Sequence, residues 1–276
     1  MLLCVDIGNT QIALGLYADT TSVSVPRPPL IRDWRMRTDP RMTADELDVA
    51  VRALLGQYAP QVSAIAALST VPSLLRELRL LLDRRTDLPS VVVGPGVRTG
   101  VPLLVDNPRE VGADRVVNTL AAHQLCGTAC IVVDFGTSTN IDVVSERGEF
   151  LGGALAPGIE ISMEALAARA AALRTVELVP PRSVIGKNTV ECLQSGVLYG
   201  FAGQVDGLVR RILEELDAGP VTVLGTGGLA PLMAGESETI TTYVPDLTLL
   251  GLRLTYLRNP GGSRPDLPTR RSTHPH

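Results

Sequence analysis

The sequence predicts an α/β protein made of two similar lobes. Three observations lead to this prediction. First, apolar runs typical of buried strands alternate with stretches of helical periodicity along most of the chain. Second, one short motif occurs twice, as CVDIGNT at 4–10 and as VVDFGTS at 132–138. Third, a chain of 276 residues is long enough for two domains of ordinary size, and a cleft between two lobes is a common place for a small substrate to bind.

The first half begins with a hairpin. Leu2 to Val5 is an apolar run that ends at Asp6, the turn contains Gly8 and Asn9, and the residues from Ile12 to Tyr17 form the second strand. Beyond it we expect an exposed loop at 20–30, an amphipathic helix at 43–58 that starts with a capping box, a strand at 64–68, a helix at 72–83 and a strand at 90–93.

The second half opens with the helix VVNTLAAHQL, which begins at Val116 and leads into a buried strand at 130–133. Asp134 ends that strand, and a turn of small residues leads to the next strand at 141–144 and then to a third. A helix at 190–213 and a strand at 221–224 follow. We place the two lobes at 1–115 and 116–258, and the segment 259–276, rich in Pro, Gly, Ser and Arg, is expected to be a mobile tail.

Composition excludes several classes of function. The 25 basic and 29 acidic residues give a net charge of −4, so no broad cationic surface is available to bind nucleic acid. No uncharged apolar run reaches the length of a membrane span, and the start of the chain lacks the basic leader of a signal peptide. The 4 cysteines are too few and too scattered for a disulfide framework, which favours a reducing cytoplasmic location.

His123, Cys126 and Cys130 lie close together in the sequence and raise the possibility of a zinc site. They fall, however, in a stretch with the pattern of a helix that runs into a buried strand. We therefore expect these side chains to be structural and do not expect zinc.

The repeated turn has the chemistry of a phosphate site. Phosphates need inward-pointing N–H donors, and the magnesium that accompanies ATP needs carboxylates nearby. Gly8 and Gly136 lack the Cβ that would block a phosphate, and Asp6 and Asp134 stand at the ends of their strands. Further donors are the side chains of Asn9, Thr10, Thr137 and Ser138.

A single turn of this kind is most often only a hairpin. Two corresponding copies, together with the glycine-rich turn GTGG at 225–228, favour nucleotide binding. The sequence contains neither GxxxxGK[ST] nor a GxGxxG that opens a helix after the first strand. This excludes a P-loop enzyme and a dinucleotide-binding domain.

What remains resembles the superfamily of acetate and sugar kinases, heat-shock proteins and actin. The resemblance implies two ribonuclease-H-like (actin-like ATPase) lobes with mixed β-sheets flanked by helices, which clasp ATP between them. Within this superfamily, the segment GPGVRTGVPLLVDNPREVGADRVVN at 94–118 is similar to type III pantothenate kinases. Further family-like stretches are DFGTST at 134–139, LGGALAPGI at 151–159 and GKNT at 186–189, so the resemblance covers nearly the whole chain.

This family resemblance implies a phosphotransferase with an alcohol group as acceptor. It would use ATP to convert pantothenate to 4'-phosphopantothenate, the first step of coenzyme A biosynthesis. The implied cofactors are a monovalent cation, potassium or ammonium, and a divalent cation, magnesium, that accompanies ATP. The implied assembly is a homodimer.

The resemblance also assigns residues. Asp114 would be the general base, and the segment Gly112, Ala113, Asp114 and Arg115 would line the pantothenate pocket. Asp134 would bind the monovalent cation, Thr137 would contact ATP, and Thr189 would touch pantothenate near the partner subunit. The ATP phosphates would be held by the first turn, which comprises Asp6, Ile7, Gly8, Asn9, Thr10, Gln11, Ile12 and Ala13.

Several alternatives stay open at this point. The chain departs from the family at Val105, where many relatives carry tyrosine, and at Asn140, where a small hydroxyl residue is usual. On the residues alone, Asp114 and Arg115 are most simply a surface ion pair at a helix start, where an acidic side chain favours the helix dipole. The other functions to weigh are a different small-molecule kinase of the same superfamily and a catalytically inactive regulatory protein. Against the inactive protein, Asp6, Asp114 and Asp134 are all present.

Overall fold

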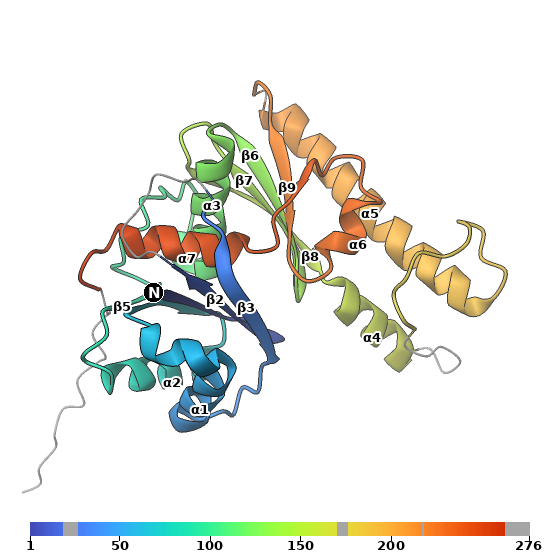
Figure 1. Ribbon diagram of the computed structural model, residues 1–276. Coiled ribbons are helices and arrows are strands. Elements are labelled where there is room, and N and C mark those ends of the chain that lie inside the picture. The colour runs from blue at the N-terminus through green and yellow to red at the C-terminus, as the bar shows by residue number, and fades with distance from the viewer. Residues whose placement is uncertain (19–26, 170–175, 217, 263–276) are drawn as a thin grey trace, which may run out of the picture. The chain divides into compact units, whose positions relative to one another are not determined.

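A computed structural model describes residues 1–18, 27–169, 176–216 and 218–262. Within these ranges the strands form two five-stranded sheets with helices against them, so the predicted α/β architecture is confirmed (Figure 1). The chain divides into two compact units, Met1–Gly100 with the segment from Leu252 onward, and Val101–Gly251. The boundary predicted between the lobes 1–115 and 116–258 stays a prediction. Most of the predicted tail, 263–276, lies outside the described residues.

The sheet of the first unit has the order β3-β2-β1-β4-β5. Its strands are β1 (Leu2–Ile7), β2 (Gln11–Tyr17), β3 (Leu30–Arg37), β4 (Ala64–Ser69) and β5 (Ser90–Val92). Neighbours are antiparallel from β1 to β3 and parallel from β1 through β4 to β5. The predicted hairpin is confirmed, with Ile7 opposite Ile12. Strand β3 is an addition to the predicted elements: it starts at the end of the segment 20–30, most of which lies outside the described residues.

Helices α1 (Ala44–Leu55) and α2 (Pro72–Asp83) lie together on one face of this sheet (Figure 1). The predicted capping box is present, because Thr43 N donates to Glu46 Oε2 at 2.8 Å and Glu46 N donates to Thr43 Oγ1 at 3.3 Å. A short 3₁₀ helix (Gly56–Gln61) follows α1. Alternate residues of the strands point toward these helices and form the apolar core with them. The core includes Leu3, Val5, Ile7, Leu14 and Leu16 of the strands and Leu47 and Leu74 of the helices.

The end of helix α7 (Leu247–Leu257) also belongs to the first unit. Its Arg253 is 2% exposed and lies with its guanidinium 5.6 Å from the centre of the Tyr17 ring. Just after the helix, Asn259 clamps the backbone of Arg98: it accepts from Arg98 N at 3.1 Å and donates to Arg98 O at 2.9 Å. These contacts tie the last described residues to the segment that follows β5.

The second unit repeats the plan of the first. Its sheet has the order β10-β9-β6-β7-β8, with strands β6 (Cys130–Phe135), β7 (Ser138–Val144), β8 (Phe150–Pro157), β9 (Thr222–Thr226) and β10 (Thr242–Tyr243). The antiparallel neighbours are again the three strands that follow one another in the chain, and the two later strands are again parallel to the first. The repeated motif therefore marks a repeated topology, with β6 and β7 in the places of β1 and β2.

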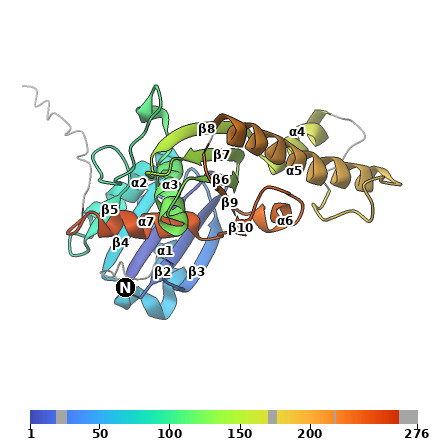
Figure 2. The same cartoon turned by 90° about the horizontal axis from the view of Figure 1, so that it is seen from above.

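Helices cover both faces of the second sheet (Figure 1). A short 3₁₀ helix (Pro108–Glu110) precedes α3 (Ala113–Cys126), which lies on one face, and α5 (Thr189–Leu216) and α6 (Ala230–Ala234) lie on the other. Helix α4 (Ile159–Arg169) packs on α5 (Figure 2). Among the described helices, none combines the length and the apolar character that a membrane crossing requires.

The two faces differ in character. The face under α5 is apolar and holds Ile131, Val133, Phe135, Ile141, Leu198, Val205 and Val223. The face under α3 carries several polar side chains. Helix α3 starts at Ala113, three residues before the predicted Val116, so Asp114 and Arg115 lie in its first turn.

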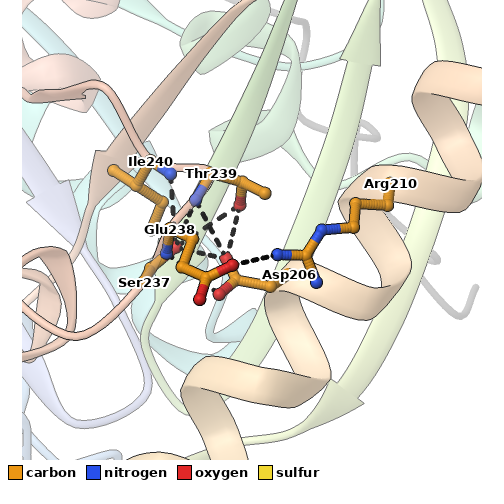
Figure 3. Close-up of polar contacts among 6 residues, drawn as sticks. All are labelled: Asp206, Arg210, Ser237, Glu238, Thr239 and Ile240. Carbon is orange, nitrogen blue, oxygen red and sulfur yellow. Dashed lines mark hydrogen bonds and ion pairs between the residues drawn. The ribbon is translucent and has the colours of Figure 1, made fainter.

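Asp206 on α5 anchors the segment between α6 and β10 (Figure 3). The residue is 4% exposed, and its carboxylate accepts hydrogen bonds from Ser237 Oγ at 2.6 Å, Thr239 Oγ1 at 2.7 Å, Glu238 N at 2.9 Å and Thr239 N at 3.1 Å. Burial raises the pKa of Asp206, but the hydrogen bonds outweigh it and hold the pKa below its usual range. The segment after the glycine-rich turn is thereby fixed to the long helix.

Replacing Asp206 with alanine is expected to lower the free energy of unfolding by about 2 to 4 kcal/mol, because it leaves several buried donors without an acceptor. Urea unfolding followed by circular dichroism measures the change. The matched control is Glu238→Gln, which removes only the exposed ion pair with Arg210 and should change the free energy by less than about 0.5 kcal/mol. Equal losses in the two variants would contradict the anchoring role.

Candidate active site

Polar side chains gather on the face of the second sheet that α3 covers. Asp134 of β6 pairs in register with Asn140 of β7, and Val132 pairs with Asp142. Because side chains alternate between the faces of a strand and registered neighbours share a face, both carboxylates point to the same side as α3. Helix α3 adds Asp114, Arg115 and Asn118 to them. The result is a group of three carboxylates and one guanidinium within the second unit.

The guanidinium of Arg115 pairs with Asp142. Its Nε and Nη2 both donate to Asp142 Oδ1, at 2.8 and 2.5 Å. The carboxylate of Asp142 is fully buried, and burial, opposed by Arg115 and reinforced by Asp114, raises its pKa to about 6. The simple interpretation of Asp114 and Arg115 as a surface ion pair is therefore wrong, because the Arg115 guanidinium pairs with a buried carboxylate on the sheet.

Asp114 stands apart from this pair. Its Oδ1 accepts a hydrogen bond from Arg115 N at 2.9 Å, and a Cβ at Gly112 would come within 2.4 Å of the same oxygen. The glycine of the GADR segment thus makes room for the carboxylate. Partial burial raises the pKa of Asp114, against the opposing Arg115 N–H and charge. A carboxylate whose pKa is shifted toward neutrality is suited to accept a proton from a substrate hydroxyl.

Asp134 lies at the end of β6 and is partly buried. Asn118 Nδ2 donates to its Oδ2 at 3.4 Å, and Thr248 Oγ1 in turn donates to Asn118 Oδ1 at 2.9 Å. Burial, and then the charges of Asp114 and Asp142, raise the pKa of Asp134 to about 7. A group with a surplus of negative charge, such as this one, gains from a bound cation.

The donor set around Asp134 fits a hard cation. A Cβ at Gly227 would lie 2.5 Å from Asp134 Oδ1 and 2.6 Å from the carbonyl oxygen of Phe135, so a carboxylate and a carbonyl oxygen both face this glycine. Oxygen ligands of these two kinds are the ones that hard cations prefer. Within the described residues, no group of three or more His, Cys, Asp or Glu side chains is arranged to hold a metal ion.

The second turn, between β6 and β7, is held in place by a backbone contact with Gly158. Gly136 N donates to Ser138 O at 3.1 Å, and Gly158 N donates to Thr137 O at 3.1 Å. A Cβ at Gly158 would lie only 2.2 Å from Thr137 O, so only glycine allows this approach. Thr137 itself is exposed at the tip of the turn.

The first turn, in the other unit, has the corresponding form. Gly8 N donates to Gln11 O at 3.0 Å, and Thr38 Oγ1 donates to Gly8 O at 2.7 Å. The side chains of Ile7 and Ile12 are fully buried in the core, so these two predicted ATP-binding residues can meet a ligand only through their backbone. Asp6, Gly8 and Ala13 are partly buried, and the exposed members of the turn are Asn9, Thr10 and Gln11.

Thr189 is exposed at the first position of α5, away from the groups on α3 in the contacts described here. The preceding Asn188 caps the helix, because its Oδ1 accepts from Glu191 N at 2.9 Å. Two residues depart from the family pattern. Val105 lies against β8, where its Cγ1 would be 3.6 Å from a Cβ placed on Gly152. The Oδ1 of Asn140 accepts a hydrogen bond from Ser138 Oγ at 2.7 Å.

The structure thus brings Asp114, Arg115 and Asp134 together, with Thr137 at the end of the same hairpin. Sequence reasoning missed Asp142 and Asn118, which complete the group. A signal was present in each case. Asp142 is a charge inside the apolar run Ile141 to Val144, and Asn118 is a polar residue on the side of α3 that is otherwise buried.

The family model and the similar relatives point to the same family. The family model for type III pantothenate kinase matches residues 2–211. The chain is 72% identical over 265 residues to a type III pantothenate kinase from Saccharopolyspora erythraea, covering 95% of this chain and 100% of that one. It is 62% identical over 263 residues to the enzyme of the same name from Rhodococcus opacus, with 94% and 96% covered.

Comparison with solved structures supports the fold. The activator of 2-hydroxyisocaproyl-CoA dehydratase from Clostridium difficile, with bound ADPNP, aligns with a TM-score of 0.57 at 11% identity over 94% of each chain. The inorganic polyphosphate/ATP-glucomannokinase from Arthrobacter aligns with a TM-score of 0.50 at 14% identity over 94% of this chain and 98% of that one. At these identities the likeness concerns the architecture alone, which is the one that the family resemblance implies.

The raised pKa of Asp134 makes stability depend on pH. Between the usual value near 4 and about 7, the folded state keeps a proton that the unfolded chain has lost, so the free energy of unfolding falls as pH rises. Asp134→Asn should remove up to about 1.4 kcal/mol per pH unit of that fall. Urea unfolding of both proteins at pH 5, 6 and 7, in buffer free of potassium and ammonium, measures it. Parallel curves for the two proteins would disprove the shift.

Proposed function

This chain belongs to the type III pantothenate kinase family and phosphorylates pantothenate with ATP, and we propose that Asp114 is the general base of this reaction. One observation carries the proposal: the Asp114 carboxylate lies partly buried in the first turn of α3, with a raised pKa, while the neighbouring Arg115 guanidinium is engaged by Asp142. The Asp114 carboxylate is therefore not paired with the Arg115 guanidinium and can accept a proton from a substrate.

The proposed step is a proton transfer coupled to phosphoryl transfer. The transition state of phosphoryl transfer is loose, so the protein contributes mainly position and charge. Asp114 orients the hydroxyl group of pantothenate and takes its proton as the oxygen attacks the γ-phosphorus of ATP, which leaves 4'-phosphopantothenate and ADP. This product is the first intermediate toward coenzyme A. Arg115 binds the carboxylate of pantothenate, beside Gly112 and Ala113.

The ATP phosphates are assigned to the turn from Asp6 to Ala13. Its exposed polar residues and the backbone of Gly8 offer donors, and Ile7 and Ile12 take part through their main chain. Thr137, at the tip of the matching turn, is a further ATP contact. Asp6 occupies in β1 the place that Asp134 occupies in β6, which suits it to the magnesium that accompanies ATP.

Asp134 is the proposed ligand of a monovalent cation, potassium or ammonium. The support is the surplus of negative charge around it and the nearby carbonyl oxygen of Phe135. A bound cation would supply positive charge next to the reacting groups and keep Asp134 ionised at neutral pH.

The proposed assembly is a homodimer. Apolar side chains next to Thr189 are unusually exposed: Val184 by 65%, Ile185 by 70% and Val190 by 47%. Covering this patch with a second copy would bring Thr189 close to the partner subunit, as the family resemblance implies for pantothenate binding. A monomer in sedimentation velocity would contradict the homodimer.

The four cysteines form no disulfide, which suits the proposed cytoplasmic location.

Asp114→Asn should lower kcat at least about a hundredfold, because the amide cannot take the proton, and it should leave ATP affinity within about threefold. Pantothenate-dependent ADP release measures turnover, and titration with a fluorescent ATP analogue measures binding.

The same assay of the wild-type protein tests the alternative functions. ADP release that is absent with pantothenate but present with a sugar would favour another kinase of the superfamily. Absence of any turnover by the wild-type protein would favour the inactive regulatory protein.

Removal of the monovalent cation should abolish most of the activity. Turnover is expected to be at least about tenfold faster in potassium or ammonium buffer than in sodium buffer, and Asp134→Asn should weaken this dependence. Initial rates across a potassium titration measure both effects. Equal rates of the wild-type enzyme in sodium and potassium would refute the cation site.

A further inference from the structure

Asp142 is a charged residue in a place where an apolar one would be expected. It lies in the middle of β7, its side chain is 1% exposed, and its strand neighbours in register are Val132 and Gly153. Its Oδ1 takes two hydrogen bonds from Arg115, while its buried Oδ2 has no hydrogen-bond partner. Burying such a pair adds little net stability, because desolvation offsets the attraction between the charges. The pair therefore calls for another explanation.

The arrangement holds the guanidinium of Arg115 from two sides. Nε and Nη2 are fixed on one oxygen of Asp142, and the guanidinium carbon lies 5.1 Å from the centre of the Phe150 ring. Gly153, opposite Asp142 on β8, places no side chain beside the carboxylate. Within the described residues, no other acceptor takes a hydrogen bond from this guanidinium, so Nη1 is available to a ligand.

The side chain of Arg115 is 16% exposed, so the held guanidinium still reaches the surface of the site. An arginine in solution samples many rotamers, and fixing one of them in advance lowers the entropy lost when an anion binds. The direction in which the N–H groups of Nη1 point also depends on the plane of the guanidinium. Asp142 and Phe150 together set that plane.

We propose that Asp142 is a positioning residue that orients Arg115 for the carboxylate of pantothenate and thereby sets the KM for this substrate. The inference rests on the proposed contact between Arg115 and pantothenate. It assigns to Asp142 no contact with substrate, because its oxygens are buried beneath the guanidinium. It also explains why a carboxylate, rather than a valine or isoleucine, occupies this position in an otherwise apolar strand.

Steady-state kinetics of Asp142→Asn tests the inference. The amide keeps the shape and one acceptor oxygen but loses the charge that holds Arg115, so KM for pantothenate should rise about tenfold to a hundredfold. The KM for ATP should stay within about twofold of the wild type. If orientation were unimportant, loss of the negative charge would leave Arg115 more attractive to an anion, and KM for pantothenate would stay the same or fall. That result would overturn the proposal.

A double-mutant cycle separates positioning from general damage. If Asp142 acts only through Arg115, then Asp142→Asn should change KM for pantothenate by less than about twofold in an Arg115→Gln background. Additive effects would overturn the proposal, as would a lower melting temperature with unchanged KM. Asp48→Asn is the matched control, because it removes a carboxylate that pairs with Arg85 and Arg52 in the other unit, and it should leave both KM values unchanged.

Phe150→Leu keeps the test decisive if Asp142→Asn does not fold. It removes the ring beneath the guanidinium and should raise KM for pantothenate by about threefold while leaving KM for ATP unchanged. An unchanged KM for pantothenate in this variant would then overturn the proposal. Failure of the wild-type protein to turn over pantothenate would instead reject the proposed function, so the two failures are distinguishable.

Discussion

Three carboxylates and one guanidinium share the face of the second sheet that α3 covers, and this imbalance of charge governs the site. Asp142 is matched by Arg115, whereas Asp114 and Asp134 have no cation of their own among the contacts described here. Partial burial makes the remaining charge costly, which is why the pKa values of both residues are raised. A proton on Asp114 and a cation beside Asp134 would each reduce the repulsion between these carboxylates. The proposed general base and the proposed cation site thus rest on one electrostatic arrangement.

The alternation of side chains along a strand makes this arrangement compatible with a stable fold. The strands β6 and β7 direct Ile131, Val133 and Ile141 into the core under α5, and the intervening residues face α3. One face supplies stability and the other carries the candidate site. The first unit uses the same order of strands, with its apolar face under α1 and α2. A duplicated topology therefore provides two similar turns, while the polar group under α3 belongs to the second unit.

Much of this could be predicted from the sequence, and the failures have physical causes. The hairpins were evident because an apolar run, an aspartate and a glycine turn occur in order, and α1 was marked by its capping box. Strand β3 is rich in charged residues and has no fully buried one, so it gives little signal of a strand. Helix α7 is apolar on most sides, which hides its period. Asp142 escaped attention because it lies inside a strand rather than at its end, where ligand-binding residues usually occur.

The backbone contact between Gly158 and the second turn has a consequence for how the protein can vary. A Cβ at position 158 would lie 2.2 Å from Thr137 O, so any other residue there would displace the turn. The shape of the turn is then constrained by Gly158, which directly follows β8, whether or not a ligand is bound. For the proposed contact of Thr137 with ATP, this means that the turn has its shape before the nucleotide binds, so less conformational entropy is lost on binding.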